Sequence, residues 1–133
     1  MFEKFDFSIR QIKKYHQAAI KDLQIAKKVD NADVKFRFSY DALLKLAITV
    51  CAKKNLRVKA RKGHHIELLR KLSIILDNKD INIIGDEMRN KRNFDLYSGG
   101  ILISKKEAEE YCVWTENIFK SADSIINDNL KLF

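Results

Sequence analysis

Apolar residues recur at steps of three and four along most of the chain, and this spacing places them on one side of an α-helix. The second such segment is also apolar on its opposite side, which predicts a central helix that packs on more than one neighbour. The pattern predicts an all-α fold, an antiparallel bundle of four to five helices in one domain over residues 1–133. The expected helices cover about residues 8–29, 64–76, 80–95 and 104–130, and a segment that follows Asp30 and Asn31 to about residue 55.

Few residues favour turns, because proline is absent and glycine occurs four times. The clearest helix start is Ser104-Lys-Lys-Glu107, which has the spacing of a capping box and opens the last helix. No segment alternates between apolar and polar residues for long enough to predict a strand. In the fourth helix we expect four apolar side chains to face inward: Ile81, Ile84, Met88 and Phe94.

Composition narrows the class of protein. The formal net charge is +8 over 133 residues and 46% of the residues are hydrophobic, which is typical of one globular domain. No apolar run is long enough for a membrane helix, and the charged first residues do not resemble a secretory signal, so we expect a cytoplasmic protein without membrane contact. Cys51 and Cys112 both lie inside apolar helical patterns, which predicts reduced, buried thiols.

The positive charge is concentrated between Lys53 and Lys62, where six basic residues occur without an acidic one. Such a segment attracts anionic partners, and nucleic acid is the natural candidate. We therefore take Lys59, Arg61 and Lys62 as candidate nucleic-acid-binding residues. The alternative is a solvated helix end whose lysines complement the helix dipole.

A histidine pair, His64 and His65, follows Gly63 at the expected start of the third helix. Backbone N–H groups at a helix N-terminus can bind an anion, and His64 is a further candidate for phosphate contact. The alternative is that the pair caps the helix or packs against a neighbour. No acidic or cysteine residue stands at ligand spacing from these histidines, so we expect neither a metal site nor a cofactor.

A third feature is the polar run from Asp86 to Tyr97. On a helix Arg89 and Arg92 share one face, and Asp86 lies one turn before Arg89, where its carboxylate can orient the guanidinium. An arginine held in this way can grip a phosphate with two hydrogen bonds. The alternative is a salt-bridge network within the bundle.

These residues resemble a known family. A bundle of this length with a Gly-His step at its third helix, an Arg-Asn pair late in the fourth and a long final helix is similar to the HEPN domains (higher eukaryotes and prokaryotes nucleotide-binding). Family members carry an arginine, often followed by asparagine, and then a histidine. In the toxin branch a tyrosine lies two positions after that histidine. Arg89 and Asn90 match the start of this motif and Tyr97 matches the tyrosine, whereas Asp95 stands at the histidine position.

The resemblance implies metal-independent RNA cleavage in active members, at a cleft between two protomers. A carboxylate is a poor proton donor at neutral pH, so Asp95 in place of histidine predicts weak or lost cleavage. The roles implied are catalytic for Arg89, Asp95 and Tyr97 and nucleic-acid-binding for Asn90 and Arg92.

We therefore expect a homodimer that binds RNA or a nucleotide, as the RNase-type component of a toxin–antitoxin or defence module. The alternative is a non-catalytic partner subunit of a minimal nucleotidyltransferase.

Overall fold

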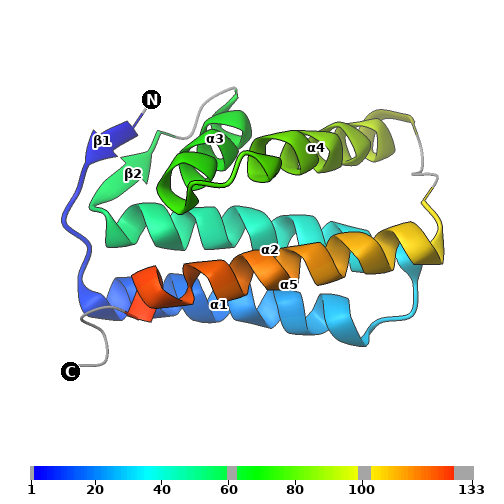
Figure 1. Ribbon diagram of the computed structural model, residues 1–133, viewed down its shortest axis with the longest axis horizontal. Coiled ribbons are helices and arrows are strands. Elements are labelled where there is room, and N and C mark those ends of the chain that lie inside the picture. Colours follow the sequence, from blue (N-terminus) through cyan, green and yellow to red (C-terminus); the bar gives the residue numbers. More distant parts are fainter. Residues whose placement is uncertain (1, 60–62, 99–102, 128–133) are drawn as a thin grey trace.

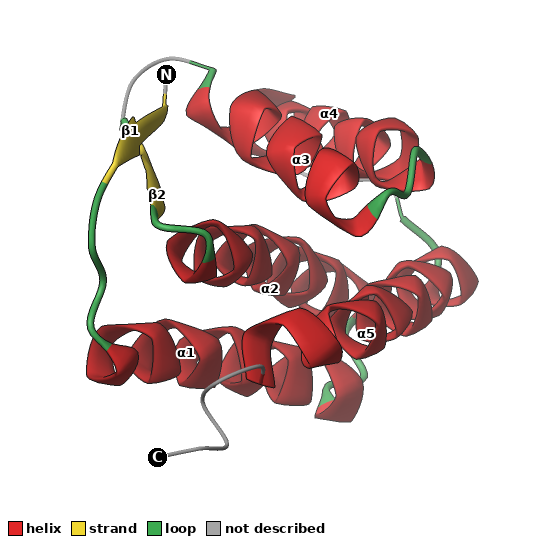
Figure 2. Ribbon diagram, turned by 60° about the vertical axis from the view of Figure 1, so that its left-hand side comes forward, coloured by secondary structure: helices red, strands yellow, loops and turns green. Residues whose placement is uncertain are grey.

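The fold is a helical bundle with a small sheet at one end. The computed structural model describes residues 2–59, 63–98 and 103–127, with the backbone alone for 95–98. Helices α1 and α5 form one layer, α2 lies in the middle, and α3 and α4 form the opposite layer (Figures 1 and 2). The elements in chain order are β1 (Phe2–Lys4), α1 (Ile9–Lys28), α2 (Ala32–Lys53), β2 (Leu56–Val58), α3 (His64–Leu76), α4 (Asp80–Ser98) and α5 (Lys105–Asn127).

Helix α2 is the centre of the core, as its two apolar sides predict. It packs against α1, α3 and α5. Its largest side chains are almost completely shielded from solvent, among them Phe36, Tyr40, Leu43 and Leu46. Burial of this kind contributes roughly 25 cal/mol per Å² of apolar surface, so these α2 side chains stabilise the packing of the helices around them.

Two short strands correct the expectation that the chain has none. Strands β1 and β2 pair in antiparallel fashion, with Phe2 opposite Val58 and Lys4 opposite Leu56. Arg57 of β2 donates a hydrogen bond to the Glu3 carboxylate at 2.8 Å. Each strand has three residues, which is too short for an alternating pattern to stand out in sequence. The pairing itself joins segments more than fifty residues apart.

Helix α4 packs on α3 at a glycine. A Cβ atom built at Gly85 would lie 3.2 Å from both terminal carbons of Leu69, so the missing side chain lets the two helices approach closely. On the other side of α4 the expectation for Phe94 is wrong, since its side chain is 56% exposed. Phe94 lies in the last turns of α4, which ends at Ser98.

The start of α5 confirms the capping box. The Glu107 N–H donates to the Ser104 hydroxyl at 3.0 Å, and the Ser104 N–H donates to the Glu107 carboxylate at 3.2 Å. Both cysteine side chains are buried and neither forms a disulfide, as the helical pattern predicted. Among the described helices, none has the length and the uncharged apolar stretch that crossing a membrane requires.

Candidate functional site

The candidate site lies where α2, α3 and α4 meet, around the side chain of Tyr40. Tyr40 comes from the middle of α2 and is only 2% exposed. Its hydroxyl oxygen lies 3.4 Å from Nδ1 of His65, in the first turn of α3, and the two rings meet edge to face. The ring of His64 stacks edge to face on His65 at a centroid distance of 4.4 Å. A buried aromatic residue therefore holds the histidine pair in place.

The first turn of α3 has no side-chain cap, because the residue that precedes it is a glycine. Gly63 adopts a left-handed backbone conformation with φ of 84° and supplies no side-chain cap. The Glu67 N–H donates to the Gly63 carbonyl at 3.2 Å, so the regular helical bonds begin there. The N–H groups of the first turn therefore keep the partial positive charge of an uncapped N-terminus.

Arg89 reaches the site from α4. Its Nε and Nη2 atoms donate to one oxygen of Asp86, at 3.1 and 2.8 Å, which confirms the expected orientation by a carboxylate one turn earlier. The Arg89 side chain is 21% exposed and that of Asp86 is 54% exposed. The pair is therefore a surface ion pair within one helix, a kind that contributes little to stability.

Arg89 and Arg92 act electrostatically on His65. Burial lowers the pKa of His65, and the positive charges of His64, Arg89 and Arg92 lower it further. Burial raises the pKa of Tyr40, while the charges of Arg89 and Arg92 oppose that rise. The His65 imidazole and the Tyr40 phenol thus interact electrostatically with the same two guanidiniums. We name Tyr40, His64, His65, Arg89 and Arg92 the arginine–histidine site.

An acidic residue lies at the edge of this site. Burial raises the pKa of Asp41, and the charge of Arg92 opposes that rise. Asp41 and Asp86 therefore offset part of the positive charge. What remains is two guanidiniums and an uncapped helix start, which are donors suited to the oxygens of a phosphate. No group of His, Cys, Asp and Glu side chains among the described residues is arranged to hold a metal ion.

The other residues expected at the site are placed differently. Asn90 is exposed and lies on nearly the opposite face of α4 from Arg92. Lys59 is exposed just after β2. Asp95 and Tyr97 lie in the last turns of α4, and their side chains are outside the described part of the structure. Arg61 and Lys62 are outside the described residues altogether.

Sequence reasoning missed Tyr40 and the role of His65. Tyr40 occupies an apolar position of α2, where the pattern predicts a core residue. Its hydroxyl group is the one sequence signal that indicated a polar contact as well. His65 was noticed beside His64, but only the packing of α3 on α2 brings it to a phenol. No protein-family model, curated protein or solved structure matches this chain.

Proposed function

We propose that this chain is a HEPN-like protein that binds RNA or a nucleotide, with a phosphate held in the arginine–histidine site. One observation carries the proposal. Arg89 and Arg92 of α4 both lower the pKa of His65 on α3, and both oppose the rise in the pKa of Tyr40, whose hydroxyl lies 3.4 Å from His65. The two guanidiniums lie on one face of α4 and repel one another, and an anion bound between them relieves the repulsion.

Arg89 can exchange its partner at little cost. Its bond with Asp86 is exposed and lies within one helix, and such pairs contribute about 0.2–1 kcal/mol. A phosphate offers the guanidinium two oxygens in a planar fork, which is a stronger arrangement than two donors on one carboxylate oxygen. The carboxylate therefore holds the side chain in place until the phosphate arrives.

The proposal includes a homodimer and, through the resemblance, a role as the RNase-type component of a toxin–antitoxin or defence module. A two-fold axis brings the same arginine from each copy to one cleft without a second gene product. Any cleavage would use Arg89 to stabilise negative charge on the phosphate, with Asp95 or Tyr97 in place of the motif histidine. Light scattering that finds only monomer would contradict the dimer.

RNA binding tests the proposal directly. We expect a labelled single-stranded RNA to bind with an affinity that falls steeply as salt rises. Arg89→Gln should weaken binding about tenfold, the size of one charged hydrogen bond to phosphate. Arg70→Gln is the matched control, because Arg70 also pairs with a glutamate three residues away but on the exposed side of α3. The same RNA, incubated with a chelator and analysed on a gel, shows whether binding leads to cleavage.

Two results would contradict the proposal. The first is an equal loss of affinity in Arg89→Gln and Arg70→Gln, which would mean that the whole basic surface binds without a site. The second is no RNA or nucleotide binding at all.

A further inference from the structure

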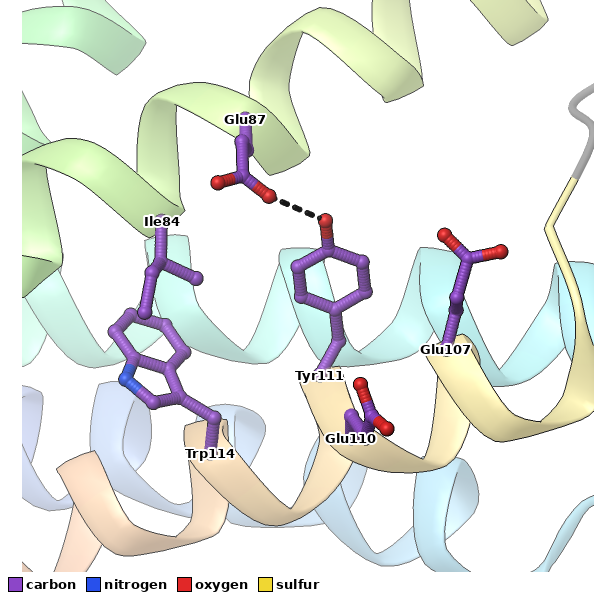
Figure 3. A pocket seen from close by; sticks show the side chains of 6 residues that line it. All are labelled: Ile84, Glu87, Glu107, Glu110, Tyr111 and Trp114. Atoms are coloured by element: carbon purple, nitrogen blue, oxygen red, sulfur yellow. Dashed lines mark hydrogen bonds between the residues drawn. The ribbon is translucent and has the colours of Figure 1, made fainter.

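A groove between α4 and α5 has a lining unlike the rest of this basic protein. Its volume is about 450 Å³. Two aromatic rings, an isoleucine and three carboxylates line it: Tyr111, Trp114, Ile84, Glu87, Glu107 and Glu110. Figure 3 shows the Tyr111 ring in the middle, with Trp114 and Ile84 on one side and Glu107 on the other. The groove belongs to neither the arginine–histidine site nor the basic segment after α2.

The groove is preformed. Helix α5 contributes residues at spacings of three and four, which places them on one face. The Tyr111 hydroxyl donates to the Glu87 carboxylate at 2.8 Å and so bridges the two helices. Lys91 lies 3.8 Å from Glu107 and makes a second bridge at one end. These two contacts fix the spacing of α4 and α5 at the groove, so a ligand need not separate the helices.

The field in the groove is negative. The pKa of Tyr111 is raised by burial, by its bond to Glu87 and by the nearby charges of Glu107 and Glu110. Glu110 is exposed and has no hydrogen bond or ion pair within the described part of the chain. Three carboxylates line the groove and Lys91 pairs with one of them, so the carboxylates outnumber the ammonium group there within the Debye length of about 10 Å.

Aromatic faces beside carboxylates form a lining that suits an organic cation. The ring quadrupole attracts a guanidinium or ammonium group, the apolar walls cover its stem, and the carboxylates neutralise its charge. We propose that this groove is a docking site for an arginine or lysine side chain of a partner polypeptide.

A polypeptide fits better than a free cation because the apolar surface continues outside the groove. Ile83 is 61% exposed and lies one turn before Glu87, on the outer side of α4. Residues that flank a basic anchor in a bound polypeptide would cover this side chain at the rim of the contact. A small cation that fills the groove leaves Ile83 in water.

Trp114 makes the test specific, because it is the only tryptophan of the chain and lines the groove. The probe is a pentapeptide with blocked termini and an arginine flanked by two leucines. The control peptide carries citrulline in place of the arginine, which has the same shape without the charge. We expect the arginine peptide to change Trp114 fluorescence in a saturable way and the citrulline peptide to have little effect.

Matched variants locate the contact. Glu110→Gln should weaken the arginine peptide about two- to fivefold, the range of a single exposed ion pair. Glu116→Gln makes the same charge change on α5 outside the groove and should leave binding unchanged. Ile83→Ser should also weaken the peptide, whereas Val113→Ser, at an exposed residue that does not line the groove, should not.

Three results would overturn the proposal. Equal binding of the arginine and citrulline peptides would mean that the positive charge is not recognised. Equal effects of Glu110→Gln and Glu116→Gln would mean that the peptide does not bind in the groove. Tighter binding of free spermidine than of the arginine peptide would make this a small-cation site and not a docking site. None of these results depends on whether the protein binds RNA.

Discussion

The Tyr40 hydroxyl and His65 Nδ1, 3.4 Å apart, join the buried centre of α2 to the first turn of α3. The imidazole is half-buried and the phenol almost wholly so. A histidine in this position reports on both the stability of the bundle and the charge around it. The charges of Arg89 and Arg92 lower its pKa, so a ligand bound to the arginines changes its protonation.

The first prediction concerns pH. Burial and three positive neighbours lower the pKa of His65 below its ordinary value of 6.5 in the folded protein. As pH falls through about 6.5 the unfolded chain therefore takes up a proton before the folded chain does, and stability decreases. Urea unfolding between pH 5 and 8 should show this loss, and His65→Gln should reduce it.

Some acid sensitivity should remain in that variant, because burial also lowers the pKa of His16. A pH profile of stability that His65→Gln leaves unchanged would contradict the assignment.

A buried lysine ties three helix ends together. The Lys35 ammonium donates to the Ala26 carbonyl in the last turn of α1 at 2.6 Å and lies 3.2 Å from the Glu109 carboxylate of α5. Lys35→Met should lower the free energy of unfolding by about 1–3 kcal/mol, because the carbonyl loses its partner in a buried place. Lys27→Met removes an exposed pair with Glu116 and should change little. Equal effects in chemical denaturation would contradict this role for Lys35.

The capping box at the start of α5 should be measurable on its own. Ser104→Ala removes the hydroxyl that accepts from the Glu107 N–H, and we expect a cost of about 1 kcal/mol. Ser121→Ala in the same helix is the control, because its hydroxyl bonds the Asn117 carbonyl in an exposed turn and alanine favours helix there. Thermal or urea unfolding of the two variants should therefore differ, and similar values would refute the importance of the cap.

The two thiols should be unreactive in the native protein. Burial raises the pKa of Cys51 to about 12 and also raises that of Cys112, so the thiolate that reacts with disulfide reagents is scarce. A thiol-specific reagent at pH 8 should modify neither residue until a denaturant is added, and then both. Rapid modification of the native protein would show that the core around α2 opens easily.

The helices were predictable because their signals are local. The start of α3 at His64 and the cap at Ser104 follow from a few neighbouring residues. The repeating apolar stripe predicts the remaining length of each helix. The strands were missed because their pairing joins residues 2–4 to 56–58 and leaves no local pattern. Phe94 was placed inward by periodicity alone, which does not reveal where the neighbouring helices leave α4 exposed.

The candidate site was predictable only in pieces. The spacing of Asp86 and Arg89 gave their ion pair, and the glycine before His64 indicated an anion-binding helix start. Their convergence depends on how α3 and α4 pack, which Gly85 permits through its contact with Leu69. The groove beside Trp114 depends in the same way on α4 and α5 lying side by side. Contacts between helices follow from tertiary packing, which no single segment encodes.

Imidazole chemical shifts of His65 during a titration with a ribonucleoside monophosphate test the central claim most directly. If a phosphate binds between Arg89, Arg92 and the histidine pair, the His65 signals shift in a saturable way and its pKa rises, because the anion favours the protonated ring. His16, on α1, should not respond. Unchanged His65 signals at nucleotide concentrations that saturate binding elsewhere on the protein would contradict the claim.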